Sequence, residues 1–149
     1  MSTMTQTTVQ VYQLFIKASP ERIWDAIVDP ELTSKYFYGS RITITPEGRV
    51  STSPDGSENW RDSEDHEWDT PRKLVHGWRT LYDLELAAEG TRRVTWEIEP
   101  QDGGVTKLTV VHDRLDASPK TAENVAGGWP FVLSGLKTLL ETGEPLVRS

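Results

Sequence analysis

Cysteine is absent from this chain of 149 residues. Without it no disulfide, thiolate nucleophile or cysteine-ligated metal site can form, and the composition fits a reducing compartment, so we expect a cytoplasmic protein. Long apolar runs are also missing, because none approaches the roughly 18 residues that a membrane-spanning helix needs. The first ten residues are polar and threonine-rich, unlike the basic and then apolar start of a signal peptide. We expect a flexible N-terminus over residues 1–8 and a single domain over residues 9–145.

Positive charge is scarce as well. Lysine and arginine number 16 against 23 aspartates and glutamates, which gives a formal net charge of −7. Nucleic acids and anionic membrane surfaces select basic faces, so we expect neither as a partner. The acidic stretch between Asp55 and Asp69 is either a solvated sheet edge or a docking face for a basic protein.

Motifs for nucleotides, nucleophilic catalysis and metals are missing too. The sequence has no phosphate-binding glycine loop, no dinucleotide fingerprint and no Gly-x-Ser-x-Gly elbow, so we expect no cofactor. His66, Glu67, Asp69 and His76 are residue types that ligate metals. Their spacing matches no compact ligand motif, and alternate residues of a strand face opposite sides, so we expect no metal site.

Tryptophan, in contrast, is plentiful. Each ring joins a large apolar surface to one N–H group, which suits the wall of a cavity as well as a packed core. The six tryptophans are spread along the chain: Trp24, Trp60, Trp68, Trp78, Trp96 and Trp129.

Three serine–proline or aspartate–proline pairs indicate helix starts, because the first residue can accept free N–H groups and proline suits the first helical position. Ser19-Pro20 and Asp29-Pro30 predict two short helices, over residues 20–28 and 30–37. Ser118-Pro119 predicts a long helix to about residue 142, with a kink or break at Pro130 because proline lacks an N–H group.

Alternating apolar residues predict strands before and between these helices. The expected strands cover residues 9–18, 41–45, 49–53, 62–69, 73–80, 81–87, 91–99 and 106–115. The strands at 91–99 and 106–115 form a hairpin around Gln101-Asp102-Gly103-Gly104. This order favours the α+β class, with a curved antiparallel sheet wrapped around the long C-terminal helix and two short helices after the first strand.

Four stretches then support a family resemblance. They are residues 18–31, residues 71–78, residues 106–112, and Gly128-Trp129 with Leu133, Leu136, Lys137, Leu140 and Glu141. Together they resemble the START-like, helix-grip (SRPBCC) superfamily of polyketide cyclases, dehydrases and lipid-transport proteins. Within it the chain is similar to the branch named for the activator of the heat-shock-protein-90 ATPase. The resemblance covers residues 9–145 and implies the helix-grip fold. Members of the branch include co-chaperones, small-molecule binders and antibiotic self-resistance proteins.

Aromatic side chains on facing elements form the candidate ligand site. By strand alternation Trp96 and His112 share the inward face of the hairpin, and Trp129 faces the sheet from the long helix. The predicted ligand-binding residues are Tyr36, Phe37, Trp78, Trp96, His112, Trp129 and Leu133, with Trp24 and Ile27 supporting the mouth. Our hypothesis is a protein that binds a small apolar or aromatic molecule between sheet and helix. The alternative for these rings is a filled core.

Two other functions remain open. One is a co-chaperone or protein-binding module that uses the acidic stretch or an exposed apolar patch. The other is a cyclase- or dehydratase-type enzyme with His112 as general base, because an ordinary histidine titrates near neutral pH. Asp113 lies on the opposite face of the same strand and cannot orient the His112 ring. No second catalytic group clearly faces His112. We therefore favour a protein that is not an enzyme.

Overall fold

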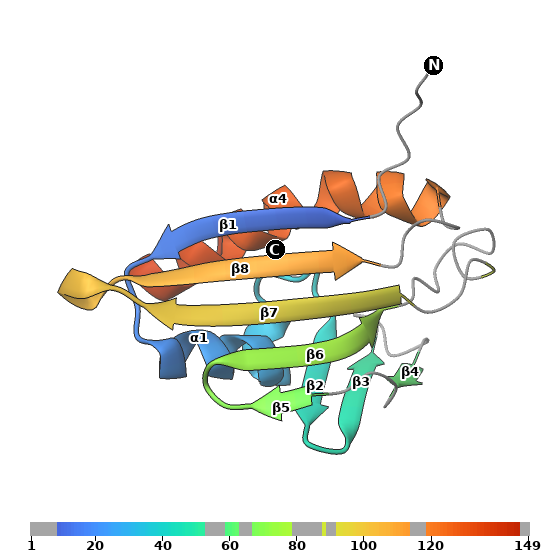
Figure 1. Ribbon diagram of the computed structural model, residues 1–149, viewed down its shortest axis with the longest axis horizontal. Helices are drawn as coiled ribbons and strands as arrows, with labels where there is room; N and C mark the ends of the chain where they lie inside the picture. Colours follow the sequence, from blue (N-terminus) through green and yellow to red (C-terminus); the bar gives the residue numbers. More distant parts are fainter. Residues whose placement is uncertain are drawn as a thin grey trace.

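The structure, a computed structural model, describes residues 9–52, 59–62, 67–78, 88, 92–113 and 119–146. Within these ranges, five antiparallel strands form the larger sheet in the order β1-β8-β7-β6-β5, and three form a smaller sheet in the order β2-β3-β4 (Figure 1). The larger sheet consists of β1 (Gln10–Ile16), β5 (Glu67–Asp69), β6 (Lys73–Trp78), β7 (Arg92–Pro100) and β8 (Thr106–Asp113). The smaller sheet consists of β2 (Arg41–Thr45), β3 (Gly48–Thr52) and β4 (Asn59–Asp62). The helices are α1 (Pro20–Val28), α2 (Pro30–Thr33), α4 (Pro119–Thr142) and the short 3-10 helix η1 (Asp102–Gly104).

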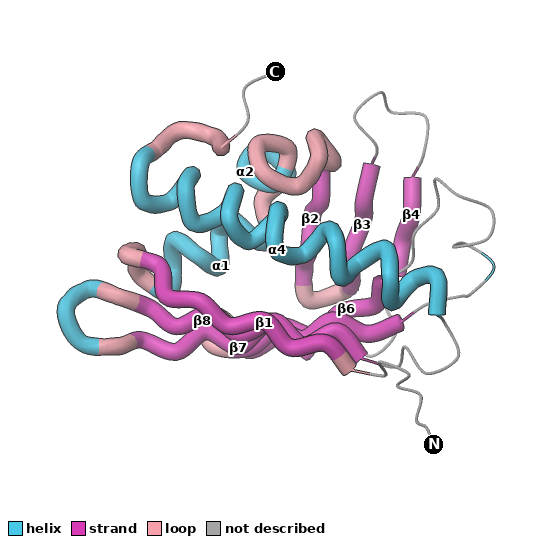
Figure 2. Tube along the Cα trace, turned by 90° about the horizontal axis from the view of Figure 1, so that it is seen from above, coloured by secondary structure: helices cyan, strands magenta, loops and turns pink. Residues whose placement is uncertain are grey.

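The larger sheet and the long helix α4 enclose the core. Figure 2 shows α4 lying across one face of this sheet, with α1 on the same side and the smaller sheet standing steeply against it. The predicted α+β class and the long C-terminal helix are therefore confirmed. The residues that share this core with less than 2% exposure include Ile16, Ile23, Leu74, Leu108 and Leu136. None of the helices described here is long and apolar enough to cross a membrane.

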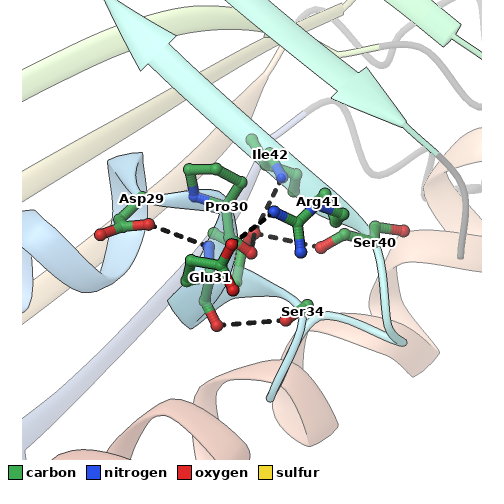
Figure 3. Close-up of polar contacts among 8 residues, drawn as sticks. Asp29, Pro30, Glu31, Ser34, Ser40, Arg41 and Ile42 are labelled. Atoms are coloured by element: carbon green, nitrogen blue, oxygen red, sulfur yellow. Dashed lines mark hydrogen bonds and ion pairs between the residues drawn. The ribbon is translucent and has the colours of Figure 1, made fainter.

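The first helix starts agree with the prediction. The Ser19 hydroxyl accepts a hydrogen bond from the Arg22 amide at 3.2 Å, and Pro20 occupies the first position of α1. The Asp29 carboxylate accepts the Glu31 amide at 2.9 Å at the start of α2, as Figure 3 shows. Each side chain satisfies an N–H group that has no partner within its own helix.

The second helix is shorter than predicted: it ends at Thr33 rather than at residue 37. The Thr33 hydroxyl donates to the Ser40 carbonyl at 3.0 Å and accepts the Ile42 amide at 2.8 Å. These bonds bring the start of β2 back to the end of α2, and Tyr38 and Gly39 turn the chain with φ of 53° and 77°. Residues 34–40 therefore form a loop that is closed at its base, here called the 34–40 loop.

The predicted hairpin is confirmed and positions the inward face of the sheet. β7 and β8 pair so that Val94 faces His112 and Trp96 faces Val110. Gly103 and Gly104 both adopt a φ of 78°, which glycine tolerates without the clash of a side chain. The single strand predicted over residues 62–69 is wrong, because β4 ends at Asp62 in the smaller sheet and β5 begins at Glu67 in the larger one.

Helix α4 continues through Pro130 from residue 119 to residue 142, so of the kink or break predicted there, the break is absent. Pro130 and Ala126, one turn before it, are exposed, and the proline ring lies on the solvent side of the helix. The helix ends as predicted at Gly143, whose φ is 82° and whose amide donates to the Leu139 carbonyl at 2.8 Å. The strand predicted over residues 81–87 and the predicted flexible N-terminus lie outside the described residues.

Candidate ligand-binding site

Two buried tryptophan–histidine pairs lie between the sheet and α4. The Trp96 indole N–H donates to His76 Nε2 at 2.8 Å, between neighbouring strands β7 and β6. The Trp129 indole N–H donates from α4 to His112 Nδ1 on β8 at 2.9 Å. The two indoles also meet edge to face, with ring centroids 5.4 Å apart. The four rings therefore form one continuous cluster that links three strands to the helix.

These hydrogen bonds decide where each histidine carries its proton. A neutral imidazole has one lone pair available as acceptor, and in both rings this lone pair receives an indole N–H. The His76 proton is then on Nδ1, which donates to the Gly77 carbonyl at 2.8 Å. The His112 proton is on Nε2 by the same argument. Neither neutral ring keeps a lone pair that can take up a proton or bind a metal.

The surroundings of His112 also favour its neutral form. Burial lowers the pKa of His112 to about 3; the neighbouring Asp113 acts in the opposite direction, and the positive charge of Arg49 lowers the pKa further. As predicted, Asp113 faces away from this ring, and it forms an ion pair with Arg93. A general base needs a pKa near the working pH and a free lone pair. This arrangement does not favour the hypothesis that His112 is a catalytic base.

A small cavity lies beside the Trp96–His76 pair, where α1, the 34–40 loop, the smaller sheet and the larger sheet meet. Its volume is about 10 Å³. It is lined by Ile27, Tyr36, Phe37, Ile42, Ile44, Arg49, His76 and Trp96. The volume matches a single water molecule. The side chains of the surrounding elements therefore fill most of the space between them.

The site was predicted between the sheet and the C-terminal helix, whereas the cavity has no lining residue from α4, and three of the predicted residues line it. Tyr36, Phe37 and Trp96 line the cavity. The Trp129 ring packs edge to face against Phe37, with ring centroids 6.0 Å apart, and Leu133 is buried on the same helix. The side chain of Trp78 lies outside the described part of the chain. Of the two residues expected at the mouth, Ile27 lines the cavity, whereas Trp24 packs edge to face against Trp68 at 4.9 Å.

Two residues that line the cavity, Arg49 and His76, are not among the predicted ligand-binding residues. Arg49 on β3 is only 4% exposed, opposite Ile44 in the register, although an arginine beside a turn is typical of a surface. The alternation of Ile42 and Ile44 was the signal for this inward face. His76 had been weighed as a metal ligand with Glu67 and Asp69. The structure turns His76 inward, while those carboxylates are exposed and pair with Lys73 and Arg72.

The 34–40 loop closes one side of the cavity and is fixed at several points. The Tyr36 hydroxyl donates to the Ala26 carbonyl of α1 at 2.6 Å. Outside, the Tyr38 ring stacks on Phe131 of α4, with ring centroids 5.4 Å apart. At the base of the loop, Arg41 and Glu31 form an ion pair at 2.7 Å (Figure 3). Phe37 sits between these fixed points with its ring toward the cavity.

An antiparallel sheet that holds a long C-terminal helix across one face, with aromatic side chains packed between the two, defines a helix-grip protein of the START-like class. More narrowly, the chain belongs to the family of activator of Hsp90 ATPase homolog 1-like proteins, whose family model matches residues 17–141. No curated protein matches the chain.

Solved structures share this fold at low sequence identity. An HSP90 activator from Plasmodium falciparum is 21% identical with a TM-score of 0.71, and the match covers 89% of this chain and 96% of that one. A protein from Mesorhizobium loti is 19% identical with a TM-score of 0.69 and the same two coverages. CalU16 from Micromonospora echinospora is 18% identical with a TM-score of 0.65, over 91% of this chain and 77% of that one. At these identities the likeness establishes the fold.

Proposed function

We propose that this protein binds a small, largely apolar or aromatic molecule on the inner side of the larger sheet, in the cavity where α1, the 34–40 loop and the two sheets meet. The observation that carries the proposal is the small cavity, whose walls are mainly aliphatic and aromatic and include the Trp96–His76 pair. Such a lining, with a few hydrogen-bonding groups at fixed positions, is typical of small-molecule sites. The membership of a family with a helix-grip fold agrees with a site at this place.

The size of the cavity defines how a guest is admitted. A dry cavity of about 150 Å³ is enough to bind benzene, whereas this one measures about 10 Å³. A guest must therefore displace a side chain. Phe37 is the candidate, because it is 9% exposed and lies in the 34–40 loop, whereas the neighbouring Tyr36 is held by its hydrogen bond to Ala26.

Truncation of Phe37 tests the proposal. In Phe37→Ala the space is formed in advance, so benzene, indole and naphthalene should bind about tenfold more tightly than to the unchanged protein, because no ring has to be displaced. Quenching of tryptophan emission and the rise in Tm with each compound measure the binding. Phe37→Leu, which removes less volume, should shift binding in the same direction.

Phe15→Ala is the matched control, because Phe15 lies on the outer face of β1 and is exposed. It should bind these compounds as the unchanged protein does. The proposal is contradicted if no compound binds either the unchanged protein or the Phe37 variants. It is also contradicted if Phe15→Ala gains affinity as Phe37→Ala does.

A second candidate function is a protein-binding module, which an exposed aromatic pair favours. Tyr38 and Phe131 are 57% and 41% exposed and stack on each other beside the 34–40 loop. Exposed aromatic surface of this kind is frequent at protein interfaces. The acidic stretch that was the other predicted docking face lies largely outside the described residues.

The protein-binding candidate is tested with purified Hsp90, because a structural relative is an HSP90 activator. The expected result is a higher ATPase rate in the presence of the protein, lost when Tyr38 and Phe131 are both changed to serine. An ATPase rate that the protein leaves unchanged, or a response that survives the double substitution, contradicts this candidate.

A further inference from the structure

The 34–40 loop presents two neighbouring aromatic residues to opposite sides. Phe37 is 9% exposed and lines the cavity, whereas Tyr38 is 57% exposed and stacks on Phe131 of α4, with ring centroids 5.4 Å apart. Resting on the proposed function, we infer that the Tyr38–Phe131 stack, here called the aromatic latch, holds the ring of Phe37 in the cavity. A guest that replaces this ring opens the latch, so occupancy of the cavity changes the outer surface beside α4.

One turn of α4 contacts both loop residues. Inside, the Trp129 ring meets Phe37 edge to face, with ring centroids 6.0 Å apart. Outside, Phe131 stacks on Tyr38, and a Cβ atom on Gly128 would lie 3.6 Å from the Tyr38 hydroxyl oxygen. Tyr38 therefore lies along the outside of the same helix turn whose inner residue contacts Phe37. Adjacent residues of the loop are thus packed against opposite sides of this turn.

The hydrogen bonds on either side of Phe37 confine any displacement to a short segment. The Tyr36 hydroxyl donates to a carbonyl of α1 at 2.6 Å, and the Ser40 carbonyl accepts the Thr33 hydroxyl at 3.0 Å. Only three residues lie between Tyr36 and Ser40. When the ring of Phe37 leaves the cavity, the backbone must therefore turn within these three residues, and Tyr38 turns with it.

The backbone at Tyr38 is strained. The Ser40 amide donates to the Phe37 carbonyl at 2.9 Å, and the two residues between them, Tyr38 and Gly39, have φ of 53° and 77°. A turn with positive φ at both central positions normally carries glycine, asparagine or aspartate there. A tyrosine in this conformation persists only where the surrounding contacts hold it. The stack on Phe131 is such a contact, so the strain favours the open loop and the latch favours the closed one.

The latch therefore sets the affinity for a guest. Only the open loop leaves room for one, and the apparent affinity is reduced by the fraction of the protein that is open. An aromatic pair of this kind shifts an equilibrium about twofold to tenfold. Removing the stack should raise the affinity of the cavity by a similar factor, although the changed residue lies outside the cavity.

Variants of Phe131 test the latch, because its side chain is 41% exposed and stands outside the cavity lining. In Phe131→Ala, benzene and indole should bind about fivefold more tightly than to the unchanged protein, as measured by quenching of tryptophan emission. Phe131→Tyr keeps a ring that can stack and should show much less of this gain. Phe15→Ala removes an exposed ring from β1 and should show none of it.

The three phenylalanines of the chain allow a direct observation of the coupling. Phe15 lies on the outer face of β1, Phe37 in the cavity and Phe131 in the latch, so protein labelled with para-fluorophenylalanine gives one fluorine NMR resonance from each. Phe15→Leu and Phe131→Leu assign the resonances. Cyclohexane, which has no aromatic ring current, should shift the resonances of Phe37 and Phe131 with the same concentration dependence and leave that of Phe15 unchanged.

The outcomes separate the latch from the proposed function. If cyclohexane shifts the Phe37 resonance and not that of Phe131, or if Phe131→Ala gains no affinity, the latch is overturned while the proposed function stands. An equal gain in Phe15→Ala also overturns the latch, because it shows a general loosening of the fold. If benzene, indole and cyclohexane bind none of these proteins, the proposed function fails and the latch fails with it.

Discussion

An indole N–H that donates to a buried imidazole fixes the histidine tautomer. The indole N–H and the accepting ring nitrogen then each satisfy the other's hydrogen bond. Trp129 and His112 form such a pair across the interface between α4 and the sheet, and His112 is fully buried. Removing one partner leaves a buried polar atom without its hydrogen bond, which costs about 1–3 kcal/mol. Removing both leaves no such atom. The pair therefore predicts strong energetic coupling between two residues 17 positions apart in sequence.

A double-mutant cycle measures this coupling. We expect Trp129→Phe and His112→Leu each to lower the free energy of unfolding, and the double variant to lose about 1–3 kcal/mol less than the sum of the two. Urea denaturation of the four proteins gives the values. The cycle cancels the loss of stability that comes from the smaller buried apolar area of phenylalanine. A single substitution cannot separate that loss from the loss of the hydrogen bond. Strictly additive losses would show that the hydrogen bond contributes nothing to stability.

At the scale of elements, glycines in α4 permit close packing against the 34–40 loop. A methyl group on Gly135 would lie 3.2 Å from the Tyr36 Cβ atom and 3.6 Å from its carbonyl oxygen. Tyr36 cannot easily retreat, because its hydroxyl is bonded to Ala26 in α1. Gly127, two turns earlier in the same helix, has open space around the same position. The two glycines thus share helix geometry and differ in their neighbours.

Alanine substitution at both glycines separates packing from helix propensity. Alanine favours a helix interior by about 1 kcal/mol over glycine, so Gly127→Ala should raise the free energy of unfolding by up to that amount. Gly135→Ala should lower it by about 1–3 kcal/mol, because crowding at Tyr36 outweighs the same gain in propensity. Urea denaturation of both variants measures the difference. Equal gains at the two positions would mean that α4 moves away from the loop without cost.

The elements that the sequence predicts well are those with local causes. The caps at Ser19 and Asp29 and the glycine turn of the hairpin act within a few residues, so their patterns are readable. The early end of α2 depends on Thr33 binding the start of β2, which no local pattern reveals. Of the kink or break predicted at Pro130, no break occurs, because the proline ring faces solvent on a helix that tertiary packing stabilises.

In the candidate site, too, local patterns predict which residues face inward, whereas tertiary packing decides which of them form hydrogen bonds. Strand alternation placed Trp96 and His112 on the inward face, and the spacing in α4 placed Trp129 opposite them. The choice of hydrogen-bond partners was not predictable, because two histidines and two tryptophans allow several pairings and only the packing of α4 selects one. Arg49 was missed because the rule that charges face solvent fails where a smaller sheet folds over the larger one.

At the scale of the whole molecule, the buried neutral histidine links stability to pH. Burial lowers the pKa of His112 to about 3 in the folded protein, while an unfolded histidine titrates near 6.5. The unfolded chain therefore binds a proton that the folded protein rejects. Stability from this group is complete above about pH 6.5 and is lost as the pH falls from there toward 3. Carboxylates contribute at lower pH; Glu141, whose pKa is lowered by hydrogen bonds from Lys137 and the Lys17 amide, loses its contribution as the pH falls below its ordinary value.

The range from pH 6.5 to 5 therefore reports the histidine rather than the carboxylates. We expect the contribution of His112 to the free energy of unfolding to fall there by up to about 1.4 kcal/mol per pH unit, which is the limit for one proton. His112→Gln keeps a hydrogen-bonding side chain that does not titrate, so its stability should start lower at pH 8 and depend less on pH over the same range. Urea denaturation of both proteins at pH 8, 7, 6 and 5 gives the two profiles, and subtracting them removes the contributions of every other group. Parallel profiles would mean that His112 takes up its proton equally well in the folded and unfolded chains. That result would contradict the full burial of His112 and its hydrogen bond from Trp129.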